Sequence, residues 1–226
     1  MAIKAKQKNI EHSSWRVLSV VLQLGLAGAI VVAQISTYGL AERAHNTDFL
    51  GLNFFSYFTI QSNIYCAIML VMGAALIASN KPYGPWFTFL RGGMVINMAI
   101  TALVYALLLQ HASAAHAGLQ WSWQNFIAHQ LAPAFVAIEW LVWAPKYQIS
   151  WRQSFLWLIY PVLWLIYTFI HAAITGWYPY PFLDPALVGG VGGVMAYVIG
   201  ITVGFTTIAS VVAWVSRRRS ELAGAF

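Results

Sequence analysis

Four side chains able to do chemistry share one face of an apolar run that begins near residue 54. Thr59, Ser62, Asn63 and Cys66 are spaced i, i+3, i+4 and i+7, which places them on one stripe of an α-helix. Polar groups are costly in hydrocarbon unless they face protein or a wet cavity. The stripe therefore predicts an inward-facing polar site, with the Thr59 hydroxyl near one end of a membrane helix.

A histidine in a later apolar run is expected at the same depth as Thr59. His129 is followed one turn later by Pro133, which frees a backbone carbonyl and permits a kink beside the imidazole. A threonine hydroxyl becomes a useful nucleophile when a neighbouring base takes its proton. With Asn63 donating to the developing oxyanion, these residues are the minimum for acyl transfer. The structural alternatives are a Thr59 hydroxyl bonded to its own helix and a His129 that only joins two helices.

Further polar side chains are candidates for binding or orienting a substrate. His171 ends a helical stripe that includes Tyr167, and it is either a second acid or base or an interfacial histidine at a helix C-terminus. Asn97 lies toward the inner half of its run and has a structural alternative too. The candidate substrate-binding residues are Ser62, Asn63, Asn97, Tyr167 and His171.

Glu139 belongs to a different depth. It follows His129 by about 15 Å at helical rise, so the two side chains cannot contact the same reacting atom. A buried glutamate is either protonated or paired with a cation, and Arg91 and Lys146 are the candidates. We expect a structural role.

The composition defines the elements that must position these residues. The 226 residues are 60% apolar and 8% charged, whereas soluble domains carry about 25% charged residues. We therefore expect an all-α integral membrane bundle forming one domain over residues 1–226. Its six apolar runs, each long enough to span a core of about 30 Å, are approximately 17–38, 54–78, 92–110, 124–144, 153–175 and 187–215. The first run is too long for the apolar region of a cleaved signal peptide.

The distribution of charge predicts the orientation of this bundle. With the N-terminus inside, the opposite side holds Arg43 as its one lysine or arginine, beside Glu42, Asp48 and Asp184. The cytoplasmic segments hold Lys4, Lys6, Lys8, Arg16, Lys81, Arg91, Lys146, Arg152, Arg217, Arg218 and Arg219. Both termini are therefore expected in the cytoplasm, in the plasma (inner) membrane if the source is bacterial. The net charge of +6 reflects this topology and not a nucleic-acid surface.

Helix signals and aromatic residues mark the outer side. Asp184 followed by Pro185 predicts the cap and first residue of the last helix. An outer aromatic belt is predicted from Trp121, Trp123, Trp177, Tyr178 and Tyr180. The single Cys66 excludes an intramolecular disulfide.

Several motifs together resemble the Pr6Pr family of six-span membrane proteins over nearly the whole chain except the two tails. The motifs are Phe54–Thr59 with Ser62 and Asn63, His129 with Pro133, Glu139 and Trp140, Tyr160 with Pro161, and Tyr178–Asp184. This family is distantly similar to the androgen-induced-gene and androgen-dependent TFPI-regulating proteins, which hydrolyse fatty-acid esters of hydroxy fatty acids with a membrane threonine and a histidine. The resemblance implies Thr59 as nucleophile and His129 as base. The residues after Thr59 differ, so the resemblance does not extend to the substrate.

Two main functional hypotheses follow. The first is a Thr59/His129 hydrolase that takes a lipid or fatty-acyl ester from the bilayer, needs no cofactor and allows a homo-oligomer. The second is a proton-coupled transporter or small-molecule-binding protein in which His129, His171 and Glu139 form a relay, although no inverted repeat is evident.

Two further chemistries rank below these. Acyl transfer through Cys66 would occur about 10 Å deeper than Thr59 and too far from His129. A zinc site on His129 and His171 would need Asp184 as its third ligand. No metal is therefore expected.

Overall fold

Six apolar helices define the molecule. The computed structural model describes the backbone of residues 2–110, 122–142 and 147–224, and the side chains of residues 14–110, 122–142 and 147–218. These parts are helices and loops without a strand, which confirms the all-α class. The helices long and apolar enough to cross a membrane are Ser14–Arg43, Phe58–Ala78, Pro85–Leu109, Trp123–Val142, Trp151–Thr175 and Val191–Arg218. A multi-pass membrane protein is the architecture that fits them.

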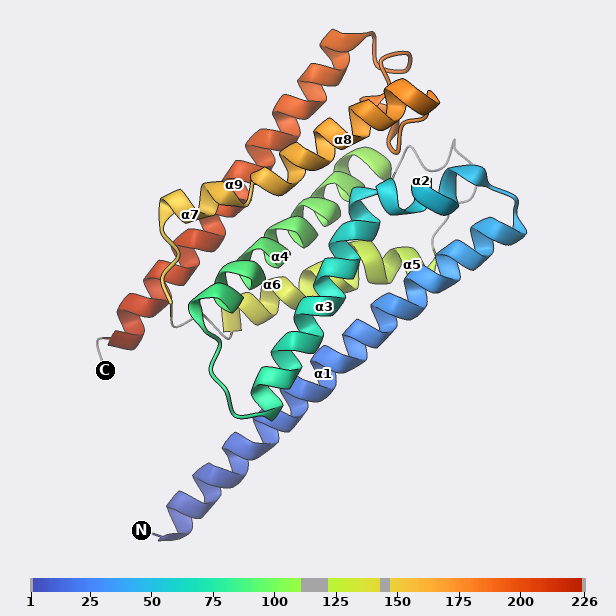
Figure 1. Ribbon diagram of the computed structural model, residues 1–226. Helices are drawn as coiled ribbons and strands as arrows, with labels where there is room; N and C mark the ends of the chain where they lie inside the picture. The colour runs from blue at the N-terminus through green and yellow to red at the C-terminus, as the bar shows by residue number, and fades with distance from the viewer. Residues whose placement is uncertain (1, 111–121, 143–146, 225–226) are drawn as a thin grey trace.

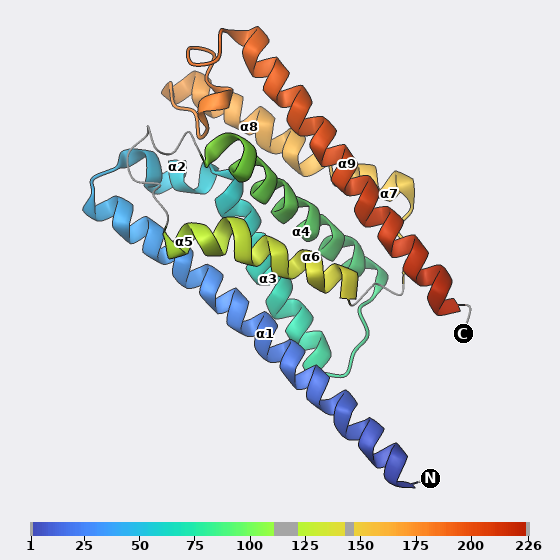
Figure 2. The ribbon, with the colours of Figure 1, turned by 180° about the vertical axis from the view of Figure 1, so that it is seen from behind.

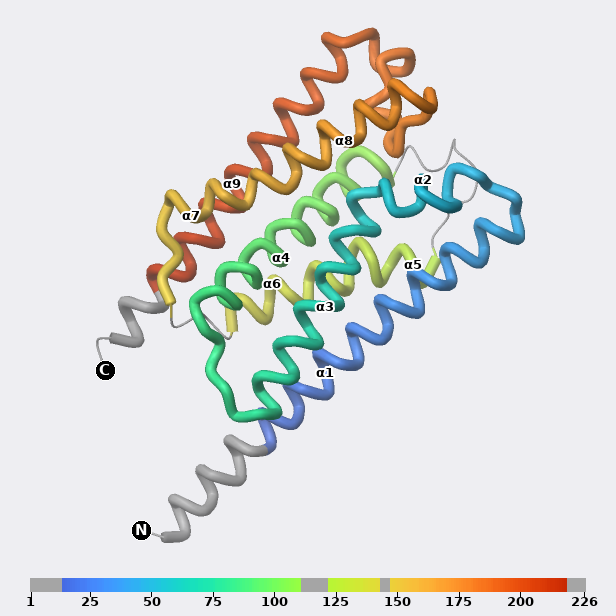
Figure 3. Tube along the Cα trace, viewed as in Figure 1, coloured from blue at the N-terminus to red at the C-terminus, as the bar shows by residue number. Residues whose placement is uncertain are grey.

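The helices pack in layers around α4 (Pro85–Val104), the most buried of the six spans (Figure 1). On one side α4 contacts α3 (Phe58–Ala78) and α6 (Ala132–Val142), and α1 (Ala2–Arg43) packs along α3 beyond them. On the other side lie α8 (Ile159–Thr175) and α9 (Val191–Gly224), as the view from behind shows (Figure 2). The N-terminal part of α1 and the C-terminal part of α9 lie at the same end of the bundle, as an even number of spans requires (Figure 3).

The second predicted span is not one continuous helix. It divides into α2 (Gly51–Ser56) and α3 at Tyr57, whose extended backbone (φ −67°, ψ 127°) interrupts the helix. The Tyr57 ring stacks on Phe49 and meets the edge of Trp177, so loop residues hold the break in place. Thr59 is the second residue of α3, so it lies at the end of a membrane helix, as predicted, but the helix begins later than the apolar run.

The fourth span departs from a regular α-helix just before Pro133, where the sequence permits a kink. A π-helical turn (Ile127–Leu131) joins α5 (Trp123–Phe126) to α6 and carries His129. Proline has no N–H to bond the carbonyl one turn earlier, and the wider turn absorbs this loss. A second π-helical turn, Tyr105–Leu109, ends the third span.

The fifth span begins as a short helix before it becomes continuous. Here α7 (Trp151–Leu156) and α8 are separated by a turn at Trp157 and Leu158. The Trp157 ring lies against Gly92 of α4, where an added Cβ would come within 2.5 Å of it. The missing side chain thus lets the fifth span approach the central helix.

The last span starts later than the sequence suggested. The run near 187 was expected to continue from an Asp184 cap, but α9 begins at Val191. Gly189 and Gly190 have φ angles of +80° and +85°, a left-handed backbone that breaks the helix. Asp184 instead accepts the Ala186 N–H at 2.9 Å, and a short turn, Pro181–Leu183, precedes it.

Candidate functional site

Thr59 and His129 meet at the end of the bundle away from the termini. Thr59 lies in the first turn of α3, and His129 lies in the π-helical turn of the fourth span. The Thr59 Oγ1 and His129 Nε2 atoms are 3.4 Å apart, within hydrogen-bond distance. Seventy residues of sequence separate the two side chains, so only the packing of the helices brings them together.

The hydrogen bonds of His129 define its tautomer. Its Nδ1 atom lies 3.2 Å from the backbone oxygen of Asn125. A carbonyl oxygen only accepts, so Nδ1 carries the proton and Nε2 presents a lone pair to Thr59. The Tyr105 ring stacks on the imidazole at 4.1 Å and fixes its plane. His129 is therefore oriented as a general base toward the Thr59 hydroxyl.

Tyr180 is the third member of this site. Its hydroxyl lies 3.3 Å from Thr59 Oγ1 and accepts the Thr59 backbone N–H at 3.2 Å. The sequence placed Tyr180 in the outer aromatic belt, and this was wrong, because the 178–184 loop turns the ring inward and buries it. Burial raises the pKa of the Tyr180 hydroxyl, so the group keeps its proton. No spacing rule links this loop to Thr59, although the motif itself was visible in the sequence.

These contacts form one directional chain of hydrogen bonds. The Tyr180 hydroxyl oxygen accepts the Thr59 N–H, and the Tyr180 O–H donates to Thr59 Oγ1. The Thr59 hydroxyl then donates to His129 Nε2, and His129 donates from Nδ1 to Asn125. Each donor has one acceptor, so the Thr59 proton already points at the base that would remove it.

Asn63 has a different position from the one expected. Its side-chain amide donates to the Thr59 backbone oxygen at 3.0 Å and to the Ala128 oxygen at 3.2 Å. Both amide protons are used, so Asn63 does not present a donor to an oxyanion. It ties the first turn of α3 to the turn that carries His129, which is a positioning role.

The rest of the α3 stripe faces inward, as predicted. Ser62, Asn63 and Cys66 are fully buried. Ser62 and Cys66 line neither of the cavities beside Thr59. The stripe therefore predicted the buried face of α3 better than it predicted a reactive set.

The remaining candidates lie apart from Thr59. His171 Nε2 contacts Asn53 Oδ1 at 2.9 Å, and Tyr167 shares a 2.7 Å hydrogen bond with Ser56 Oγ. These pairs join α8 to α2. Asn97 is buried in α4. None of the three candidates lines the cavities beside Thr59.

Two cavities meet at Thr59 and Tyr180. The outer chamber, of about 480 Å³, extends from His129 to the loops that hold Asp48 and Asp184. The lateral chamber, of about 160 Å³, lies among α3, α4, α8 and α9. Its walls are almost entirely apolar and include Phe58, Phe205 and Leu165 among other residues. Thr59 thus lies between a cavity whose walls mix polar and aromatic side chains and a cavity that is almost entirely apolar.

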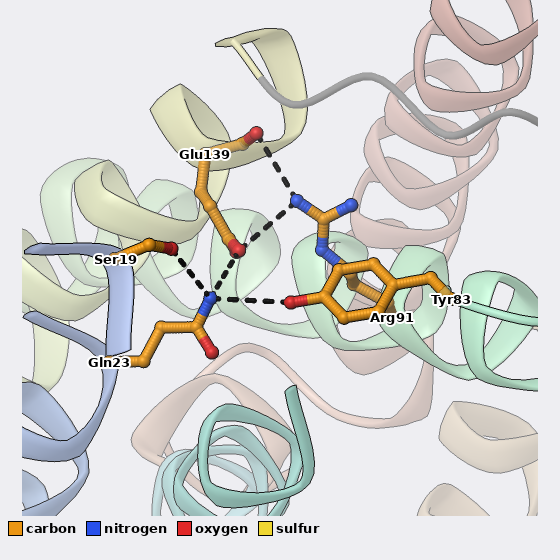
Figure 4. A network of polar contacts seen from close by, with 5 residues as sticks. All are labelled: Ser19, Gln23, Tyr83, Arg91 and Glu139. Atoms are coloured by element: carbon orange, nitrogen blue, oxygen red, sulfur yellow. Dashed lines mark hydrogen bonds and ion pairs between the residues drawn. The ribbon is translucent and has the colours of Figure 1, made fainter. Parts of the chain in front are cut away.

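A second polar cluster, called the inner cluster, surrounds the Glu139 carboxylate (Figure 4). It consists of Ser19, Gln23, Tyr83, Arg91 and Glu139. The Arg91 guanidinium and the Glu139 carboxylate are 3.2 Å apart, so of the alternatives that the sequence left open, the structure shows the pairing with Arg91. Lys146, the other candidate partner, lies outside the described residues. Gln23 donates to the same carboxylate at 2.9 Å.

Within the described parts of the chain, no three His, Cys, Asp or Glu side chains gather as a metal site would require. Comparisons of this chain with protein-family models, with curated proteins and with solved structures find no match.

Proposed function

We propose that this protein is an intramembrane hydrolase of acyl esters that uses Thr59 as nucleophile and His129 as general base. The observation that carries the proposal is the oriented Thr59–His129 pair, which lies where the apolar lateral chamber meets the outer chamber with its mixed polar and aromatic walls. The resemblance to membrane threonine hydrolases favours the same chemistry. A lipid ester has an apolar acyl chain and a more polar alcohol part, which match the lateral chamber and the outer chamber.

The reaction follows from the hydrogen bonds. Thr59 Oγ1 attacks the ester carbonyl carbon while its proton passes to His129 Nε2. Tyr180 then donates its O–H to the oxygen that becomes negative. The bond to the alcohol oxygen breaks, and His129 returns the proton to the leaving alcohol. Water from the outer chamber, activated by His129, cleaves the acyl–Thr59 ester and releases the fatty acid.

Thr59 variants of matched shape test this proposal. Thr59→Val keeps the volume of the side chain and removes the hydroxyl, whereas Thr59→Ser keeps the hydroxyl. Purified protein in detergent is given 4-nitrophenyl octanoate, and covalent labelling by a fluorophosphonate is measured in parallel. We expect both signals from the wild type and from Thr59→Ser, and neither from Thr59→Val or His129→Gln.

Folding must be monitored in the same samples. A size-exclusion profile and melting temperature close to wild type would show that Thr59→Val remains folded. Hydrolysis at the wild-type rate by folded Thr59→Val would disprove the proposal.

A relay for proton-coupled transport has less support. Glu139 is held by Arg91 and Gln23 in the inner cluster, and His171 is held by Asn53. The partners of Glu139 and His171 thus differ from those of His129, which bonds to Thr59 and Asn125. The hydrolase is therefore the function that the geometry supports best.

A further inference from the structure

The outer chamber carries negative charge on its walls. Asp48 and Asp184 line it, and among the described residues that line it there is no lysine or arginine. The segment 111–121, whose structure is not described, contains neither residue type in its sequence. An anionic substrate group would meet two carboxylates here without a counter-charge from the known walls.

The same chamber is rich in aromatic rings. Phe49, Tyr57, Trp177 and Tyr178 line it together with Tyr105. The Tyr57 ring stacks on Phe49 at 4.8 Å and meets Trp177 edge to face at 5.5 Å, so this wall is rigid. Aromatic faces beside carboxylates bind quaternary ammonium groups, because the ring quadrupole and the full charge both attract a weakly hydrated cation.

The lateral chamber is suited to the acyl part of the substrate. Only small polar areas interrupt its apolar walls, and Thr59 and Tyr180 line both chambers. An acyl chain placed there would bring its ester carbonyl to the Thr59 hydroxyl. The alcohol part would then extend into the outer chamber, toward Asp48, Asp184 and the aromatic wall.

We infer that the preferred substrates are acyl esters whose alcohol part carries a fixed positive charge, as in a choline ester. This inference rests on the proposed hydrolase and names the class of its leaving group. The acyl chain lies in the lateral chamber, and the ammonium group lies between the two carboxylates and the rings of Tyr57 and Trp177.

Three esters of equal chain length test the sign of the charge. Octanoylcholine is compared with 3,3-dimethylbutyl octanoate, which replaces the ammonium nitrogen by carbon and is neutral. The third ester is 4-octanoyloxybutanoate, which is anionic and, like the other two, an ester of a primary alcohol. We expect kcat/KM for the choline ester to exceed that for the neutral isostere about tenfold, with the anionic ester slowest.

Variants of the chamber test the residues. Asp184→Asn keeps the oxygen that accepts the Ala186 N–H and removes the negative charge. Asp48→Asn removes the other negative charge of the outer chamber. Each variant is expected to lower the ratio of choline-ester to neutral-ester kcat/KM several-fold, and the double variant to bring it near one. Glu42→Gln is the matched control, because Glu42 is an exposed carboxylate near the same loops that lines neither chamber. It should leave the ratio unchanged.

The outcomes separate this inference from the proposed function. Equal hydrolysis of all three esters, or a preference for the anionic one, overturns the inference and leaves the hydrolase intact. Hydrolysis of every ester at the background rate of Thr59→Val overturns both. A ratio that falls equally in Glu42→Gln would assign the effect to general surface charge and also overturn the inference.

Discussion

The inner cluster and the Thr59 site both place polar groups inside the bundle, but only the Thr59 site borders open space. In the inner cluster, Arg91 and Glu139 are 2% and 5% exposed, and Gln23 bridges to the carboxylate. In the site at Thr59, by contrast, the hydroxyl group borders two cavities. Polar groups inside a membrane must find partners. The inner cluster pairs its two charges with each other and with Gln23, whereas the Thr59 site leaves space in which a substrate can lie.

This difference teaches how to separate structure from function among buried polar residues. A charged pair closed on every side by protein joins helices, here α1, α4 and α6. A pair with a directed proton and adjacent empty space is able to react. Burial and polarity alone would have placed Glu139 above Thr59 as a functional candidate, since an intramembrane charge is the more costly group.

The largest effect should come from breaking the inner ion pair. Glu139→Ala leaves the Arg91 charge buried without its carboxylate, and we expect a loss of about 3–5 kcal/mol in the free energy of unfolding. The double variant Arg91→Met/Glu139→Leu should recover much of this loss. Unfolding in detergent measures both, and hydrolysis per folded molecule should stay at the wild-type value. A stable Glu139→Ala protein without activity would instead place the inner cluster in the mechanism.

Removing one hydroxyl at the Thr59 site should instead lower the rate of hydrolysis strongly and the stability only slightly. Tyr180→Phe keeps the ring and its packing but removes the donor to the developing oxyanion. We expect kcat for ester hydrolysis to fall about 10²–10³-fold, and the free energy of unfolding to fall by only about 1 kcal/mol. Steady-state kinetics on the folded variant measure this. An unchanged kcat would show that Tyr180 serves packing alone.

A smaller effect is expected where Asn63 joins the two halves of the site. Asn63→Leu removes the hydrogen bonds to the backbone oxygens of Thr59 and Ala128. Interhelical hydrogen bonds in membranes contribute about 0.6 kcal/mol on average and up to about 1.7 kcal/mol. We expect a loss in that range and about a tenfold slower reaction, because His129 is then less firmly placed. Loss of stability with full activity would contradict the positioning role.

The smallest effect should come from a helix cap outside both clusters. The Ser150 Oγ accepts the Gln153 N–H at 3.2 Å, and the Gln153 Oε1 accepts the Ser150 N–H at 2.8 Å. Ser150→Ala should cost about 1 kcal/mol and leave the hydrolysis rate unchanged. This variant calibrates how much destabilisation alone alters the assay. A slower rate here would require the other kinetic effects to be corrected for stability.

Much of the architecture could be predicted from local sequence. Apolar run length predicted the six spans, because a helix must satisfy its own backbone to cross hydrocarbon. Spacing predicted the buried face that includes Ser62 and Asn63, and helical rise predicted that His129 and Glu139 belong to different depths. The cost of an isolated buried charge limited Glu139 to protonation or to pairing with Arg91 or Lys146, and only the structure selected Arg91.

Tertiary structure alone decided how the site is assembled. The break at Tyr57, which places Thr59 in a first turn, depends on rings from two loops, Phe49 and Trp177. Tyr180 reaches Thr59 across 121 residues of sequence. Periodicity describes a residue's face and depth on its own helix, and it contains no information about which loop folds back over that helix. The Thr59 and His129 side chains were therefore visible in the sequence, but their contact, their third partner and their two chambers were not.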